Sequence, residues 1–152
     1  VRDGAVQIGV VRNPVTDDTY SALRGSGAWR NGATMRVREA TSLQDGITGM
    51  GCSARTRPAD LAYIAERLLD AGGMYHRTGS GALTLAYLAA GQLIGYVEMH
   101  INAWDCLAAI LLIEEAGGVV NDFLAQNGLT GGGPLVAGGP DVYPQLLALL
   151  PA

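Results

Sequence analysis

The chain has 152 residues, a formal net charge of −4, 49% hydrophobic residues and 16% charged residues. This length suffices for one globular unit with a sizeable core, and the hydrophobic content excludes a disordered chain. The acidic balance, with arginines as the only strongly basic residues and no basic cluster among them, argues against nucleic acid as a partner.

The cysteines and the hydropathy pattern indicate the cellular setting. Cys52 and Cys106 lie far apart and form no CxxC pair, so we expect a reducing cytoplasm and neither a structural disulfide nor a zinc site. Every apolar run is interrupted before it reaches about 18 residues, so we expect no membrane span and no membrane partner.

Residues 1–44 have the pattern of antiparallel β-structure. An apolar run at Ala5–Val11 and an alternating run at Thr19–Arg24 flank a turn that contains Asn13-Pro14 and Asp17-Asp18. The dipeptide Asn31-Gly32 suits the positive φ angles of a tight hairpin turn. The first strand would leave one sheet edge unpaired. We expect a preceding segment, absent from this chain, to cover that edge, with a second subunit as the alternative.

From residue 45 onward, strand and helix patterns alternate. The expected strands are 45–52, 74–79, 93–99, 119–122 and 134–138, and the expected helices are 58–71, 80–92, 104–116 and 141–150. Asp141 is the candidate N-cap of the final helix. This alternation predicts an α/β fold in which antiparallel hairpins precede a mixed, largely parallel sheet flanked by helices. We therefore expect two domains: 1–44, part of an antiparallel-sheet domain truncated at its N-terminus, and 45–152, a C-terminal α/β domain.

The segment "GYVEMHINAWDC", residues 95–106, concentrates polar side chains between two apolar runs. Asp105 falls in the first turn of the expected helix, where it is either a capping residue or an oxygen ligand for Mg²⁺. Glu98 ends the preceding strand and could enter the same cleft. Glu114 and Glu115 lie about 14–15 Å further along the helix axis, too far to share an ion, and we expect them to be solvated. Asn102 is expected to be a loop residue.

Two small-residue segments also lie where a strand gives way to a helix or loop. They are "GCSAR" around Ser53 and "GSGA" around Ser80 and Gly81, at the sheet end where ligands bind in α/β folds. Ser80 could present backbone amides to an anion at a helix N-terminus, or the segment could serve only tight packing and capping. His76 and His100 do not have the spacing of metal ligands.

Two long stretches resemble the inositol monophosphatase family of Mg²⁺-dependent, lithium-sensitive sugar and cyclitol phosphatases. "GVVRNPVTDDTYSALRGSGAWRNGATMRV" is similar to the central β-hairpins of that family. "GSGALTLAYLAAGQLIGYVEMHINAWDCLAAILLIEEAGGVVND" is similar to its C-terminal signature, where a Trp-Asp pair precedes a helix that ends Glu-Ala-Gly-Gly. The resemblance covers essentially the whole chain and implies the layered α/β sandwich of sugar phosphatases.

The resemblance also implies roles for individual residues. Asp105 matches an aspartate that ligates a catalytic metal ion, and Glu98 matches a glutamate that accepts hydroxyl groups of the cyclitol ring. Ser53 matches a serine of the same pocket, and Gly81, with Ser80 before it, falls where the backbone of the family approaches the substrate. The implied reaction is hydrolysis of a phosphorylated cyclitol or sugar, with inositol 1-phosphate as the expected substrate.

The other ligand signatures of the family, Gly-Glu-Glu and Asp-Pro-(Ile/Leu)-Asp-Gly-Thr, do not occur here. We therefore expect about two or three Mg²⁺ ions and a homodimer in an intact enzyme, of which this chain is the C-terminal half and inactive alone. Sister activities on histidinol phosphate, fructose 1,6-bisphosphate or 3′-phosphoadenosine 5′-phosphate remain alternatives. A non-catalytic protein-binding remnant is a third possibility.

Overall fold

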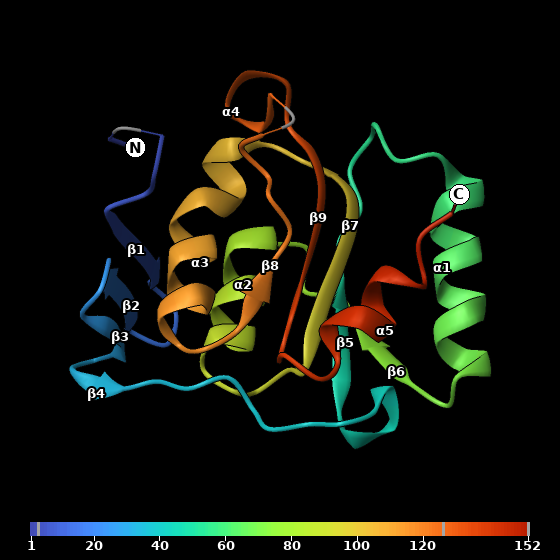
Figure 1. Ribbon diagram of the computed structural model, residues 1–152, viewed down its shortest axis with the longest axis horizontal. Helices are drawn as coiled ribbons and strands as arrows, with labels where there is room; N and C mark the ends of the chain where they lie inside the picture. Colours follow the sequence, from blue (N-terminus) through green and yellow to red (C-terminus); the bar gives the residue numbers. More distant parts are fainter. Residues whose placement is uncertain (3, 126, 152) are drawn as a thin grey trace.

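The computed structural model describes residues 1–2, 4–125 and 127–151. Two β-sheets and the helices between and beside them form four layers (Figure 1). A small sheet from the first part of the chain packs against α2 (Gly81–Ala89) and α3 (Ala103–Glu115), and these helices cover one face of a larger sheet. On the opposite face of the larger sheet lie α1 (Pro58–Asp70) and α5 (Tyr143–Leu147). The predicted fold class, antiparallel hairpins followed by a mixed sheet flanked by helices, is confirmed.

The small sheet is fully antiparallel and its strands follow chain order. Its members are β1 (Ile8–Asn13), β2 (Asp18–Leu23), β3 (Gly27–Arg30) and β4 (Ala33–Thr34). The expected Asn31-Gly32 turn joins β3 to β4, with φ angles of 50° and 84°. Two consecutive positive φ angles match the twist of the flanking strands, which explains the choice of Asn and Gly at these positions.

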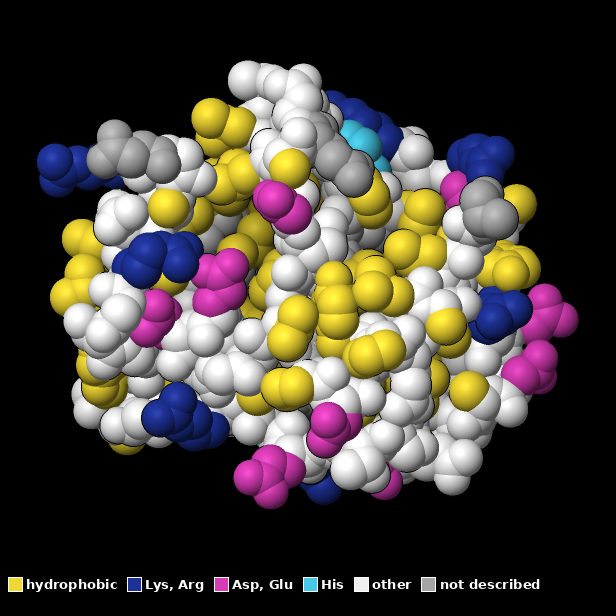
Figure 2. Space-filling model, in the orientation of Figure 1, with side chains coloured by type: hydrophobic (Ala, Val, Ile, Leu, Met, Phe, Trp, Pro, Cys, Tyr) yellow, Lys and Arg dark blue, Asp and Glu magenta, His cyan; other side chains and the backbone are white. Residues whose placement is uncertain are grey.

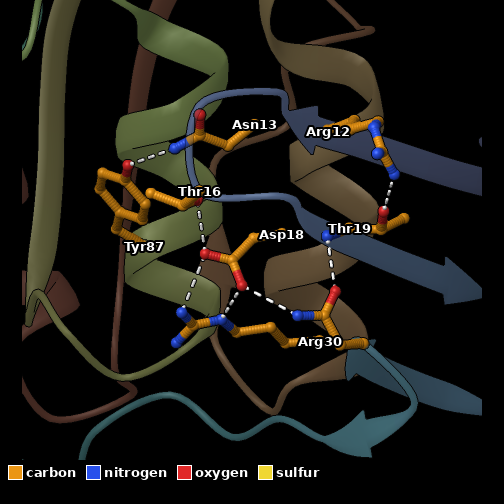
Figure 3. Close-up of polar contacts among 8 residues, drawn as sticks. Arg12, Asn13, Thr16, Asp18, Thr19, Arg30 and Tyr87 are labelled. Atoms are coloured by element: carbon orange, nitrogen blue, oxygen red, sulfur yellow. Dashed lines mark hydrogen bonds and ion pairs between the residues drawn. The ribbon is translucent and has the colours of Figure 1, made fainter.

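A polar network ties the turn between β1 and β2 to the end of β3 (Figure 3). Asp18 accepts two hydrogen bonds of 2.9 Å from the guanidinium of Arg30 and one of 2.7 Å from the hydroxyl of Thr16. These donors hold the pKa of Asp18 at about 2, well below its ordinary value, with the Arg30 hydrogen bond as the largest cause. Asn13 donates to the hydroxyl of Tyr87 at 3.3 Å, which ties the hairpin to α2.

The large sheet has the strand order β6-β5-β7-β9-β8. Its members are β5 (Ile47–Met50), β6 (Met74–His76), β7 (Gly95–Ile101), β8 (Val119–Val120) and β9 (Gly133–Gly138). β5 is parallel to β6 and β7, whereas β9 is antiparallel to β7 and β8. The sheet is thus evenly mixed rather than largely parallel, because β9 returns from β8 without a crossover that would make them parallel.

Two predicted boundaries are wrong. Asp45 belongs to a 3-10 turn, Leu43–Asp45, instead of beginning a strand, because its carboxylate accepts from the amides of Thr41 and Ser42. The final helix is only Tyr143–Leu147 and its N-cap is Val142, so Asp141 does not cap it. Pro144 lies in the first turn, where its missing N–H costs no helical hydrogen bond, whereas Pro151 disfavours the helical conformation at Leu150 and so limits the helix at its C-terminal end. A short helix, α4 (Gly128–Gly131), was not predicted.

The central strand β7 divides the core. Tyr96 belongs to the hydrophobic cluster shared with α2 and α3, while Val97 belongs to the cluster shared with α1 and α5. Since successive side chains of a strand point to opposite faces, Glu98 lies on the same face as Tyr96. The first cluster also contains Val11 and Tyr20, so both sheets share one core. The division into domains at residue 44 remains a prediction.

Glu115 is not solvated as expected. One of its carboxylate oxygens accepts from the amide of Gly25 at 2.7 Å, and the other accepts from Gly27 at 2.8 Å. Glu114 pairs with Arg24 at 2.9 Å in a more exposed setting. These contacts fix the C-terminal end of α3 against the β2–β3 turn.

The outer face of the small sheet is apolar. Ile8, Val10 and Leu23 are 67%, 55% and 47% exposed, and β1 forms the edge of the sheet. Figure 2 shows hydrophobic side chains gathered at the side of the molecule over these strands. The opposite face of the same strands packs on α2 and α3. In the part of the chain that the structure describes, no helix has the length and apolarity needed to cross a membrane.

Candidate active site

Three segments converge at the end of the large sheet where β5 and β7 terminate. They are the loop after β5, the turn that leads into α2, and the junction between β7 and α3. Together they line a cavity of about 270 Å³. All five residues singled out from the sequence border it, namely Ser53, Ser80, Gly81, Glu98 and Asp105. This is the sheet edge at which ligands bind in open α/β folds.

Asp105 lies in the first turn of α3, which begins at Ala103 with Asn102 as its N-cap. A capping role would require a hydrogen bond from a first-turn amide to the carboxylate. Within residues 1–2, 4–125 and 127–151, neither Asn102 nor Asp105 makes such a side-chain cap. The half-buried carboxylate of Asp105 therefore borders the cavity with its oxygens free, in a position where the helix dipole favours negative charge.

Glu98 is the most buried acidic group of the cavity, with 5% of its surface exposed. Its Oε2 accepts a hydrogen bond of 2.5 Å from the hydroxyl of Tyr96. Burial is the largest cause of the raised pKa of Glu98, and the charge of Asp105 adds to it. The hydrogen bond from Tyr96 and the charges of His100 and Arg77 act in the opposite direction. Glu98 is thus a largely buried carboxylate whose pKa is subject to opposing contributions.

The two serines make local hydrogen bonds while they line the cavity. Ser80 is the N-cap of α2, and its hydroxyl accepts from the amide of Leu83 at 3.3 Å. The hydroxyl of Ser53 accepts from the amide of Arg55 at 3.3 Å. Ser80 therefore caps α2 and also lines the cavity, while an anion at the backbone amides of this helix N-terminus remains a prediction. Each hydroxyl retains its proton to donate to a ligand.

A smaller chamber of about 50 Å³ adjoins the cavity. Glu98, Ser80 and Gly81 line both spaces, while Tyr96 and Arg77 line only the chamber. A side chain at Gly81 would have its Cβ 2.8 Å from Ile101 Cδ1, so glycine keeps this boundary open. Glu98 consequently lies where the two spaces meet.

Several lining residues were not singled out as site residues. His100 and Asn102 border the main cavity, and Asn102 Oδ1 accepts a hydrogen bond of 3.4 Å from Arg55 across the loop after β5. His100 Nε2 lies 3.2 Å from the carbonyl oxygen of Gly131. The period of two along β7, which places Tyr96, Glu98 and His100 on one face, was the available signal.

The chain offers Mg²⁺ an incomplete ligand set. Mg²⁺ prefers oxygen ligands in octahedral geometry, usually one or two carboxylates with water and substrate phosphate. Asp105 fits one such position, since its carboxylate has no competing partner in the described ranges. Those ranges contain no group of three or more His, Cys, Asp or Glu side chains that could hold a metal ion. Asp105 alone does not make a metal centre.

Known proteins provide an independent comparison. The family model described as "Inositol monophosphatase family" matches residues 1–150. An inositol-1-monophosphatase of Mesorhizobium japonicum is 36% identical over 149 residues, which cover 96% of this chain and 56% of that protein. The Nus factor SuhB of Escherichia coli strain K12 is 36% identical over 147 residues, which cover 95% of this chain and 55% of that protein.

Solved structures show the same similarity. The extragenic suppressor protein suhB of Bartonella henselae has a TM-score of 0.86 at 30% identity, over 96% of this chain and 57% of that chain. The inositol monophosphatase of Anabaena (Nostoc) has a TM-score of 0.83 at 29% identity, over 97% of this chain and 60% of that chain. This chain spans a little over half the length of these relatives. By sequence and by fold, the chain belongs to the inositol monophosphatase family.

Proposed function

We propose that the chain is part of a Mg²⁺-dependent phosphomonoester hydrolase that converts inositol 1-phosphate and water to inositol and phosphate. The observation that carries this proposal is the convergence of Ser53, Ser80, Glu98 and Asp105 on one cavity at the end of the large sheet. A carboxylate for a metal and a buried acceptor for a sugar hydroxyl are the groups that such a reaction needs. Family membership supports phosphatase chemistry in general.

Each residue has a distinct part in the proposal. Asp105 would hold one Mg²⁺ ion, and magnesium in such a site supplies Lewis-acid activation of the phosphate ester. Glu98 accepts a hydroxyl of the cyclitol and so orients the ring. The hydroxyl groups of Ser53 and Ser80 donate to oxygens of the substrate, and Gly81 leaves room for the ring to approach the backbone. Among the described residues, Asp105 is the one metal ligand that the proposal assigns.

The test is phosphate release by the native gene product that carries this sequence. Inositol 1-phosphate, histidinol phosphate, fructose 1,6-bisphosphate and 3′-phosphoadenosine 5′-phosphate are compared with and without Mg²⁺. We expect the largest kcat/KM for inositol 1-phosphate and loss of activity on chelation of the metal. Preference for one of the other three esters would reassign the substrate, and no Mg²⁺-dependent release from any of them would refute the hydrolase proposal. A homodimer and a cytoplasmic location remain predictions.

A second candidate is a protein-binding role. Several similar proteins bear the name Nus factor SuhB, and Ile8, Val10 and Leu23 present an apolar face to solvent. This role predicts a monodisperse chain that binds a protein partner in the presence of a metal chelator. Sedimentation of the purified chain with EDTA tests the binding role, because aggregation of the chain on its own would remove the basis for that role.

A further inference from the structure

Tyr96 lies directly beneath the carboxylate of Glu98. The ring is fully buried, and its hydroxyl donates to Glu98 Oε2 at 2.5 Å. Both side chains project from the same face of β7, two residues apart, so the rigid strand fixes their separation. A short hydrogen bond to a carboxylate in a dry environment is stronger than an ordinary neutral hydrogen bond.

Gly51 lies against the hydrogen-bonded side chains of Tyr96 and Glu98. Its amide donates to the carbonyl of Val97 at 2.9 Å, which brings the loop after β5 close against β7. A Cβ at Gly51 would lie 2.5 Å from Glu98 Cδ and closer still to Glu98 Oε2 and the Tyr96 hydroxyl. Gly51 therefore packs against the hydrogen bond between Tyr96 and Glu98, and the absence of a side chain at this position leaves room for both oxygens.

The two carboxylate oxygens of Glu98 differ in their hydrogen bonding. Oε2 is taken by Tyr96, whereas Oε1 has no hydrogen-bond partner among the described residues. Glu98 also lies where the main cavity and the small chamber meet. We propose that Tyr96 is a positioning residue, which locks the carboxylate of Glu98 so that Oε1 is presented to a hydroxyl group of the substrate. This inference rests on the proposed function and extends it to the recognition of polyol esters.

We expect Tyr96 to affect the choice between substrates rather than the chemical step. A site built to bond a substrate hydroxyl discriminates strongly against an analogue that lacks the hydroxyl, because the buried polar group is then left unpaired. A carboxylate free to rotate would lose part of this discrimination. Tyr96 should therefore influence esters of polyols and have little influence on esters whose leaving group carries no hydroxyl.

The test compares Tyr96→Phe with the unchanged native gene product on two substrates, inositol 1-phosphate and p-nitrophenyl phosphate. We expect kcat/KM for inositol 1-phosphate to fall about tenfold, mainly through KM, while the value for p-nitrophenyl phosphate changes by less than about twofold. The matched control is Tyr87→Phe, which loses a hydroxyl that accepts from Asn13 on the far side of α2. This control should leave the ratio of the two values unchanged.

A second variant separates positioning from general structural damage. In a Glu98→Ala background, which removes the acceptor of the Tyr96 hydroxyl, Tyr96→Phe should cause less than about a twofold further change, since the two residues act as one unit. Equal loss on both substrates, or no loss on inositol 1-phosphate, overturns the positioning role. Either result leaves the hydrolase proposal intact if the unchanged protein shows Mg²⁺-dependent phosphate release. Absence of that release from the unchanged protein would refute the hydrolase proposal itself.

Discussion

The packing around Glu98 makes Gly51→Ala a sharp probe of the site. The backbone of Gly51 does not have a positive φ angle, so alanine can adopt its conformation without backbone strain. The added Cβ would nevertheless lie 2.5 Å from Glu98 Cδ and overlap the oxygens of Glu98 and Tyr96. The substitution thus perturbs the carboxylate by crowding alone.

The magnitude follows from two opposing effects. Overpacking of a well-filled interior costs about 1–3 kcal/mol, whereas alanine in place of glycine recovers about 0.4–1 kcal/mol through the unfolded chain. The net loss in the free energy of unfolding should be about 1–2 kcal/mol. For a chain of this size each kcal/mol lowers Tm by about 2–4 °C, so a decrease of about 2–8 °C is expected.

Urea denaturation of four proteins measures the effect and its cause. Gly51→Ala is made in the original sequence and in a Glu98→Ala/Tyr96→Phe background, from which the three nearest atoms have been removed. In that background the alanine should cost less than about 0.5 kcal/mol, since the three closest contacts of its Cβ are absent. An equal loss of stability in both backgrounds would show that the crowding lies elsewhere and would refute the geometry described for the site.

Two pH-dependent predictions follow from charged groups in different settings. The pKa of Glu98 is raised above its ordinary value of 4.5, so the contribution of Glu98 to stability is complete below that pH and is lost as the pH rises through the raised pKa. In Glu98→Gln the amide oxygen can still accept from Tyr96. This variant should lose less stability between acidic and neutral pH in urea titrations, and it should have lower activity. An unchanged dependence of stability on pH would argue against burial of the charge. Asp18 has the opposite sign, because its pKa falls from 3.8 to about 2 on folding. The contribution of Asp18 to stability is complete above pH 3.8 and disappears toward pH 2. Asp18→Asn should therefore reduce stability at neutral pH and weaken the loss of stability in acid. An unchanged loss of stability in acid would contradict the role of the Arg30 contact.

Local signals in the sequence predicted much of the fold. The Asn31-Gly32 turn formed as expected because only the backbone geometry of two adjacent residues decides it. The helix from Pro58 ended near Gly72, as the Pro and Gly positions predicted, because caps and breakers act within one turn. The final helix is shorter than predicted because the apolar pattern continues to Leu150, whereas Pro151 disfavours a helical conformation at that residue.

Contacts between distant residues were beyond the reach of these patterns. Glu115 finds its partners in amides at residues 25 and 27, so its spacing on α3 alone indicated only a solvated face. The relation between Gly51 and Glu98 likewise depends on the parallel pairing of β5 with β7. By contrast, the period-two alternation of a strand is enough to place Tyr96 and Glu98 on the same face of β7. The face on which a strand residue lies was thus more predictable than its contacts with distant segments.

The role of Asp105 can be tested most directly by the Mg²⁺ dependence of phosphate release. Wild-type protein and Asp105→Asn are compared over a Mg²⁺ titration with inositol 1-phosphate, and circular dichroism verifies that both are folded. If Asp105 ligates the ion, the asparagine variant should lose at least about 100-fold in kcat/KM at fixed Mg²⁺ and need more metal for half-maximal rate. Near-normal turnover with an unchanged Mg²⁺ requirement would contradict the assignment of this cavity as the active site.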